Sequence, residues 1–210
     1  MSKRSLFIRV VLVALIYVVF AAPLPLQEVL VKPLRPAVDG YLSLGPFLDT
    51  RIEPFPHAGY PIDSAIKVKG RYPIPQNPAP VLTVPVSLQA LVVSPFVLFF
   101  SLFLLSKLRR KRLLIVLGLG TLLILGFVGF RLYIPVVENI AGVPIDLFVD
   151  PGKLGSEIFS LLINHPRLLA VLSYATYESP FAPIIFPGVV WIGLVAASSP
   201  KLFSNSQARA

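Results

Sequence analysis

The sequence predicts a mainly α, polytopic membrane protein with four transmembrane helices and a small Pro-rich, β-containing extracytoplasmic segment. Composition is the first reason: the chain of 210 residues is 55% hydrophobic and only 14% charged, whereas soluble domains are about 25% charged. The second reason is that apolar runs of spanning length recur along the chain. The third is a compact basic cluster that separates two of these runs.

The first segment, residues 1–24, is expected to hold a cytoplasmic N-terminus and the first transmembrane helix. Its apolar run follows a short basic stretch, an order that secretory signal peptides share. The run is close to spanning length, and Pro23 directly after Ala22 disfavours cleavage at that point. We therefore expect an uncleaved span at residues 5–24.

The largest extramembrane segment, residues 25–87, is rich in proline and is expected to contain a β-hairpin. Partial alternation at residues 65–69 and a β-branched run at 81–86 predict two short strands. The connection between them, residues 72–80, contains four prolines. Pro85 would confine the second strand to an edge of its sheet.

Residues 88–130 are expected to form a transmembrane helical hairpin. Residues 88–106 and 113–130 carry no formally charged side chain, and each run is long enough to span a bilayer. The stretch between them is typical of a short cytoplasmic loop that also contacts anionic lipid head groups. Its cations are Lys107, Arg109, Arg110, Lys111 and Arg112.

The second helix of this hairpin contains candidate helix-packing glycines. Their spacings are two, six and three residues, so no GxxxG motif is present. Glycine lets a neighbouring backbone approach closely in a membrane, while ordinary transmembrane glycine is the alternative interpretation. These residues are Gly118, Gly120, Gly126 and Gly129.

Residues 131–179 are expected to form a second extracytoplasmic segment with short helices along the membrane interface. Apolar positions recur at helical spacing from Leu154 onward, but His165 and Arg167 argue against a crossing helix there. Residues 180–210 then supply the fourth transmembrane helix and a polar cytoplasmic tail.

The distribution of charge predicts the orientation. With both termini and the basic loop inside, the inner side holds ten Lys and Arg, while the much longer outer segments hold nine together with all ten Asp and Glu. We therefore expect a multi-pass protein of the bacterial cytoplasmic (inner) membrane with both termini cytoplasmic. The net charge of +9 does not indicate nucleic-acid binding, because about half of the basic residues flank expected spans.

Few residues suggest catalysis or metal binding. The chain has no cysteine, and its two histidines do not stand at metal-ligand spacing, so no catalytic residue, metal site or cofactor is predicted. The expected spans lack acids and central cations, which disfavours a pump or coupled transporter. A candidate polar outer site comprises Asp49, Arg51, Glu53 and His57, and a second polar group comprises Glu157, His165 and Arg167, with solvated loops as the alternative interpretation.

The parts follow a characteristic order. An N-terminal span leads to a β-containing outer segment, then to a hairpin entered through VSPF at residues 93–96 and turned at residues 107–112. A second outer segment with short helices follows, and Tyr174 and PFAP at residues 180–183 precede the last span. This layout, which covers most of the chain but contains no specific motif, resembles that of exosortase H-associated integral membrane proteins.

The resemblance implies a protein that accompanies a membrane sorting enzyme. The catalytic Cys, Arg and His of such an enzyme would come from the partner, because this chain has no cysteine. We therefore expect a non-enzymatic accessory subunit of a bacterial inner-membrane complex, associated with surface-protein sorting or export. Its expected partners are membrane lipids and another integral membrane protein, such as an exosortase, but no nucleic acid. The alternative is a membrane enzyme or carrier with a polar site at the extracytoplasmic surface.

Overall fold

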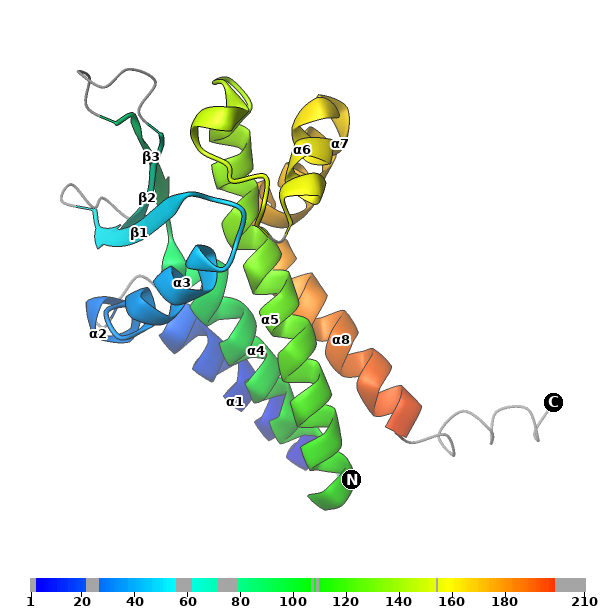
Figure 1. The fold of residues 1–210 in the computed structure, drawn as a ribbon. Helices are drawn as coiled ribbons and strands as arrows, with labels where there is room; N and C mark the ends of the chain where they lie inside the picture. Colours follow the sequence, from blue (N-terminus) through cyan, green and yellow to red (C-terminus); the bar gives the residue numbers. More distant parts are fainter. Residues whose placement is uncertain are drawn as a thin grey trace.

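The computed structural model of the chain shows a mainly α protein with one small antiparallel sheet (Figure 1). It describes residues 3–21, 27–55, 62–71, 79–106, 108, 110–153 and 155–198. Within these residues the α-helices are α1 (Lys3–Ala21), α2 (Gln27–Val31), α3 (Leu34–Ser43), α4 (Ser94–Leu102), α5 (Arg110–Ile140), α6 (Ser156–Asn164), α7 (Pro166–Ser173) and α8 (Ala182–Ser198). The strands are β1 (Asp49–Pro54), β2 (Ser64–Lys69) and β3 (Val81–Val86).

Short helical turns extend some of these helices. The turn η1 (Gln89–Val93) leads directly into α4, and η4 (Tyr174–Glu178) directly follows α7; both are π-helical. The 3-10 turn η2 (Phe103–Leu105) continues α4, and η3 (Ile145–Leu147) is a separate 3-10 turn after α5. Helix α4 is therefore the middle of a continuous helical run.

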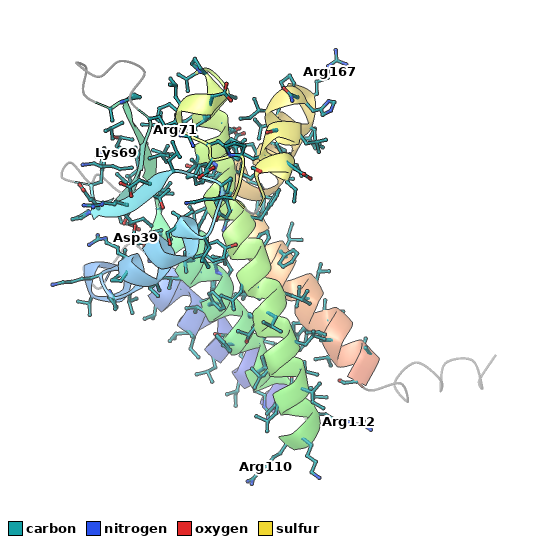
Figure 2. All side chains as sticks on the ribbon, in the orientation of Figure 1. Asp39, Lys69, Arg71, Arg110, Arg112 and Arg167 are labelled. Carbon is teal, nitrogen blue, oxygen red and sulfur yellow. The ribbon has the colours of Figure 1, made fainter. Side chains whose placement is uncertain are left out.

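Helices α1, α4, α5 and α8 form a bundle in which α4 packs against the other three (Figure 1). The beginnings of α1 and α5 and the end of α8 lie at one end of this bundle, and the sheet, α6 and α7 lie at the other. Arg110 and Arg112 mark the first end, whereas Asp39, Lys69, Arg71 and Arg167 surround the second (Figure 2). We call these the basic end and the sheet end.

Helix α5 is by far the longest element, with 31 residues. At about 1.5 Å per residue it measures roughly 46 Å, which exceeds the hydrocarbon thickness of a bilayer, about 30 Å. It includes the cations from Arg110 to Arg112 and continues ten residues beyond the expected end of the span at residue 130. Arg131 does not end the helix because its charge is bonded inside the protein.

Within the described residues, α5 alone is long and apolar enough to cross a membrane by itself. A second candidate is the pair Ser156–Asn164 and Pro166–Glu178, which passes the same test jointly but is bent by 102°. The structure therefore provides one or two such helices rather than the four that the sequence predicts. The remaining apolar helices are shorter, at Phe7–Val19, Gln89–Leu102 and Ala182–Ser198.

The sheet is an antiparallel meander in the order β1-β2-β3. The expected hairpin is present as β2 and β3, but the sequence did not predict β1. Its charged residues alternate with Thr50 and Ile52, which turn toward the protein. Ile52 lies opposite Ile66, which in turn lies opposite Val84, so a half-buried strand was mistaken for a solvated loop.

Asp63 fastens the sheet to the helical bundle. Its carboxylate accepts hydrogen bonds from the backbone N–H groups of Leu88, at 2.9 Å, and Gln89, at 3.0 Å, and so caps the start of the helical run η1–α4. The buried Arg35 of α3 donates to the carbonyl of Asp63 at 3.1 Å and to the hydroxyl of Ser64 at 3.3 Å. These bonds fix α3 and β2 over the beginning of α4.

Candidate functional site

Arg131, in the sheet-end part of α5, is the most unusual buried group of the described residues. Only 2% of its surface is exposed. Its Nε donates to the carbonyl of Thr176 at 2.6 Å, and one terminal nitrogen donates to the carbonyl of Ala90 at 3.0 Å. The guanidinium also lies over the Phe127 ring, 5.5 Å from its centroid. A buried charge of this kind is tolerated only where polar groups of the protein replace water.

Both acceptors are carbonyls of π-helical turns that have no helical donor. In the π-helical register of η1, Ala90 would bond to the residue five positions on, which is Pro95 and has no N–H. In the π-helical register of η4, Thr176 would bond to Phe181, whose N–H donates instead to the hydroxyl of Ser179 at 3.3 Å. Both carbonyls are thus left without a helical donor, and Arg131 satisfies them.

Arg131 of α5 therefore links the segment before α4 and the segment before α8 to α5. Ala90 lies just before α4, and Thr176 lies just before α8. Within the described residues no carboxylate lies at ion-pair distance from this guanidinium. Tyr177 lies nearby, and its pKa is raised mainly by burial and next by the charge of Glu138. The arrangement is suited to holding helices in register rather than to acid–base chemistry.

The sequence contained a partial signal for the hydrogen-bonded site around Arg131. Pro95 and Pro180 each follow a serine and precede a phenylalanine, so the same short run, SPF, marks both helix entries. Arg131 itself was missed as a site residue, because a charge next to an apolar run was taken as its end. What could not be foreseen is that the two freed carbonyls face this one side chain.

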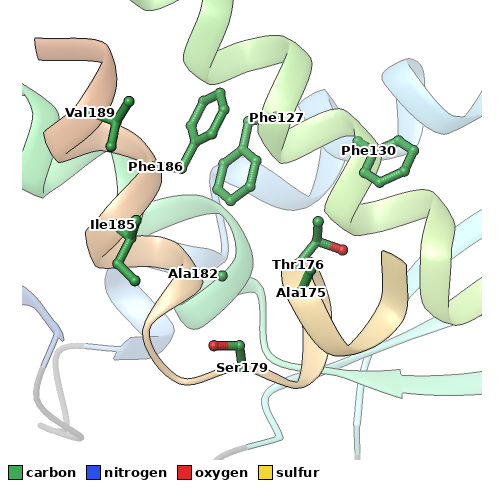
Figure 3. Close-up of a pocket in the computed structure, with 9 residues that line it drawn as sticks. All are labelled: Phe127, Phe130, Ala175, Thr176, Ser179, Ala182, Ile185, Phe186 and Val189. Atoms are coloured by element: carbon green, nitrogen blue, oxygen red, sulfur yellow. The ribbon is translucent and has the colours of Figure 1, made fainter. Parts of the chain in front are cut away.

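Two apolar hollows lie along α5. The lower hollow, about 490 Å³, lies between α5, η4 and α8, and the stacked rings of Phe127 and Phe186 are part of its lining (Figure 3). The upper hollow, about 560 Å³, lies between α5, α6 and the loop after α3. Phe130 lines both hollows. Tyr41 borders the upper hollow, and burial raises the pKa of its phenol.

The four candidate packing glycines divide into two pairs. A side chain at Gly120 would collide with the Phe99 ring of α4, and one at Gly129 would collide with Tyr41 of α3. These two glycines already serve packing within the chain. A side chain at Gly118 or Gly126 would meet nothing, so those two lie on an open side of α5.

The cations of the expected cytoplasmic loop lie at the start of α5. Arg110, Lys111 and Arg112 are exposed in its first turn, at the end of the bundle opposite to Arg167 (Figure 2). The guanidinium of Arg112 donates to the carbonyl of Ser198 at the end of α8, at 2.7 Å. The other two cations, Lys107 and Arg109, lie outside the described residues.

The candidate polar outer site is not gathered in a cavity. Asp49, Arg51 and Glu53 occupy alternate positions on β1, and Glu53 forms a partly exposed ion pair with Lys67 at 2.6 Å. None of the hollows found in the described part of the protein contains these residues. His57 lies outside the described residues.

The second polar group is also divided. Glu157 borders a small hollow of about 270 Å³ beside Asp146, whereas His165 and Arg167 border a separate open depression at the corner between α6 and α7. Among the described residues, no three His, Cys, Asp or Glu side chains are grouped so as to hold a metal ion. Comparison of the chain with protein-family models, curated proteins and solved structures gives no significant match.

Proposed function

We propose that this protein is a four-pass accessory subunit of the bacterial inner membrane that holds another integral membrane protein, an exosortase-like sorting enzyme, in place. The open glycine-bearing side of α5 carries this proposal. The chain itself would contribute helix packing and an outer domain, and the partner would contribute the catalytic residues. The likeness of the layout to exosortase H-associated proteins supports the choice of partner.

Exposed apolar surface supports a location in the bilayer. On α1, Phe7, Leu15 and Val18 are mostly exposed, and on α5 the same holds for Leu114 and Ile115. A water-soluble monomer rarely exposes contiguous apolar surface of this extent. In a bilayer the same side chains face lipid at no cost.

Helix lengths are compatible with four crossings. The 19 residues of α1 extend about 28 Å and the 17 residues of α8 about 26 Å. Thinning of the bilayer and snorkelling of flanking cations accommodate helices somewhat shorter than the hydrocarbon core. The concentration of cations at the basic end of the bundle supports a cytoplasmic location for that end, with the sheet outside.

The open side of α5 is suited to a second helix. Gly118, Leu122 and Gly126 follow one another at intervals of four residues and so lie on one face. Leu122 is 65% exposed, and the space beside both glycines is empty. Small residues that flank a large one allow close approach and interdigitation of a partner helix in a membrane.

Co-purification tests the proposal. The tagged chain is co-expressed with an exosortase-type enzyme from the same organism and purified in mild detergent. We expect a stoichiometric complex that the paired substitutions Gly118→Leu and Gly126→Leu disrupt while the chain itself remains folded. Gly193→Leu on α8, which also fills open space, is the matched control and should leave the complex intact. A monomeric chain, or a complex indifferent to the α5 substitutions, would refute the proposal.

A further inference from the structure

One face of α5 lines both apolar hollows. The half-buried Phe127 and Phe130 and, beneath the upper hollow, the almost fully buried Ile134 and Val137 border them. Their spacings of three, four and three residues place them in one stripe along the helix. Because Phe130 belongs to both linings, the hollows adjoin. We call the two hollows together the groove; α8 and η4 lie beside its lower part and α6 beside its upper part.

The groove has a definite depth if the protein is embedded as proposed. Phe127 lies 15 residues beyond Arg112, or about 22 Å along the helix, and Val137 lies 25 residues beyond it, or about 38 Å. The hydrocarbon core is about 30 Å thick. The groove therefore begins within the outer half of the core and ends at head-group level.

The lining suits a hydrocarbon chain. In the lower hollow the polar side chains are those of Thr176 and Ser179. The Thr176 hydroxyl already donates to the carbonyl of Leu172 at 2.6 Å, and the Ser179 hydroxyl accepts from the N–H of Phe181 at 3.3 Å. A sugar or a peptide would therefore find few free partners there, whereas methylene groups need none.

A cation lies next to the upper part of the groove. The Lys153 ammonium donates to the carbonyls of Phe47, at 2.6 Å, and Ser43, at 3.4 Å, the residues on either side of the loop that lines the upper hollow. An ammonium has three donors, and no carboxylate lies at ion-pair distance from this one in the described part of the chain. One donor is thus available to an anionic oxygen.

We propose that this groove binds one phospholipid of the outer leaflet, with an acyl chain along the α5 stripe and the phosphate at Lys153. An outer-leaflet lipid has its head group outward and its tail toward the bilayer centre, which is the order of the upper hollow, beside Lys153, and the lower hollow along α5. The proposal rests on the membrane location proposed above. The bound lipid fills the space between α5 and α6 and so stabilises the outer domain.

Photo-crosslinking tests the site. The full chain is reconstituted in nanodiscs that contain phosphatidylglycerol with a diazirine in its acyl chain, and crosslinked peptides are mapped. We expect labelling concentrated on residues 127–137 and 175–189. Ile158→Trp, which fills the upper hollow, should abolish it. Leu161→Trp on the same helix, which borders the depression beside His165 instead, is the matched control and should not change it.

A second comparison tests the head-group contact. Lys153→Gln should reduce labelling by phosphatidylglycerol about fivefold, the effect expected for one cation near an anionic lipid surface. It should leave labelling by a diazirine diacylglycerol, which lacks the phosphate, unchanged. Equal loss with both probes would contradict a phosphate contact.

Two outcomes would overturn the proposal. Labelling spread evenly over α1 and the basic-end part of α5 would mean ordinary boundary lipid, and labelling unaffected by Ile158→Trp would mean that the groove is not the site. Failure of the chain to reconstitute into nanodiscs would instead refute the membrane location. The two failures are therefore distinguishable.

Discussion

Helix α5 is uninterrupted, but its two halves suit different surroundings. We call residues 110–126 its basic half and residues 127–140 its sheet half. In the sheet half, Leu132, Ile134 and Val136 are almost completely buried against other elements. In the basic half, Leu114 and Leu122 are more than 60% exposed. The sheet half is like the core of a water-soluble domain, whereas the basic half needs an apolar solvent.

The two halves also differ in how they use polar groups. The sheet half contains the buried guanidinium of Arg131 and lies near the capped start of η1, where Asp63 binds two backbone N–H groups. In the basic half the cations lie in the first exposed turn. Buried directional polar bonds therefore fix the sheet end, while at the basic end the Arg112 side chain donates to the carbonyl of Ser198 at the exposed surface.

Removing Arg131 should have the largest effect on stability. Arg131→Leu leaves the carbonyls of Ala90 and Thr176 without a donor. Hydrogen bonds to charged groups contribute about 1.5–3 kcal/mol each, so we expect a loss of about 3–6 kcal/mol, measured by thermal unfolding in detergent. Arg131→Lys should recover only part of this free energy, because a single ammonium replaces a planar guanidinium that donates to both carbonyls. Unchanged unfolding would contradict the role of Arg131.

Asp63→Ala should have the next largest effect. It removes the acceptor that caps the helical run η1–α4, and loss of a cap costs about 0.5–2 kcal/mol. Asp63→Asn, which keeps one acceptor oxygen, should lose less. Asp49→Ala, at an exposed position on β1, is the control and should stay within about 0.5 kcal/mol of the parent. Equal effects at the two positions would contradict the capping role.

Two glycines of α5 provide a matched comparison between its halves. Gly129→Ala forces a methyl group against Tyr41 and should cost about 1–3 kcal/mol of overpacking. Gly126→Ala meets open space and should be neutral or stabilising by up to about 1 kcal/mol, because alanine favours the helix. The difference between the two unfolding temperatures measures the change of surroundings within one turn of helix.

Glu53→Gln should have the smallest effect. It breaks the ion pair with Lys67. The side chain of Lys67 is 40% exposed and that of Glu53 is 47% exposed. Pairs of this kind contribute about 0.2–1 kcal/mol. A double-mutant cycle with Lys67→Gln, read by urea unfolding, should give a coupling energy in that range that falls as salt is added. A coupling several times larger would indicate that the outer face of β1 is more than a solvated surface.

The sequence predicted the parts that depend on local pattern. Apolar runs marked the helices, the β-branched run at residues 81–86 marked β3, and charge density marked the basic end. What it did not predict depends on contacts between distant residues. Strand β1 can be recognised only once the fold shows that Thr50 and Ile52 face the core. Arg131 can lie within a helix only because its guanidinium donates to two carbonyls of other segments.

The candidate sites follow the same rule. Two glycines of α5 already pack against side chains of other helices, Gly120 against Phe99 and Gly129 against Tyr41. The sequence alone could not show which glycines these are. The polar residues Asp49, Arg51 and Glu53 were grouped because they are close in sequence, and the strand does place them on one face. Proximity along the chain could not reveal that this face has no hollow among those found in the described residues.

Cysteine labelling tests the central claim, the opposite placement of the two ends of the bundle across a membrane. The chain has no native cysteine, so Lys111→Cys and Arg167→Cys each introduce one thiol at an exposed position. With a membrane-impermeant maleimide on cells whose outer membrane alone is permeabilised, the Arg167→Cys variant should be labelled. The Lys111→Cys variant should react only after the inner membrane is opened. Equal labelling of both variants from outside would contradict this account.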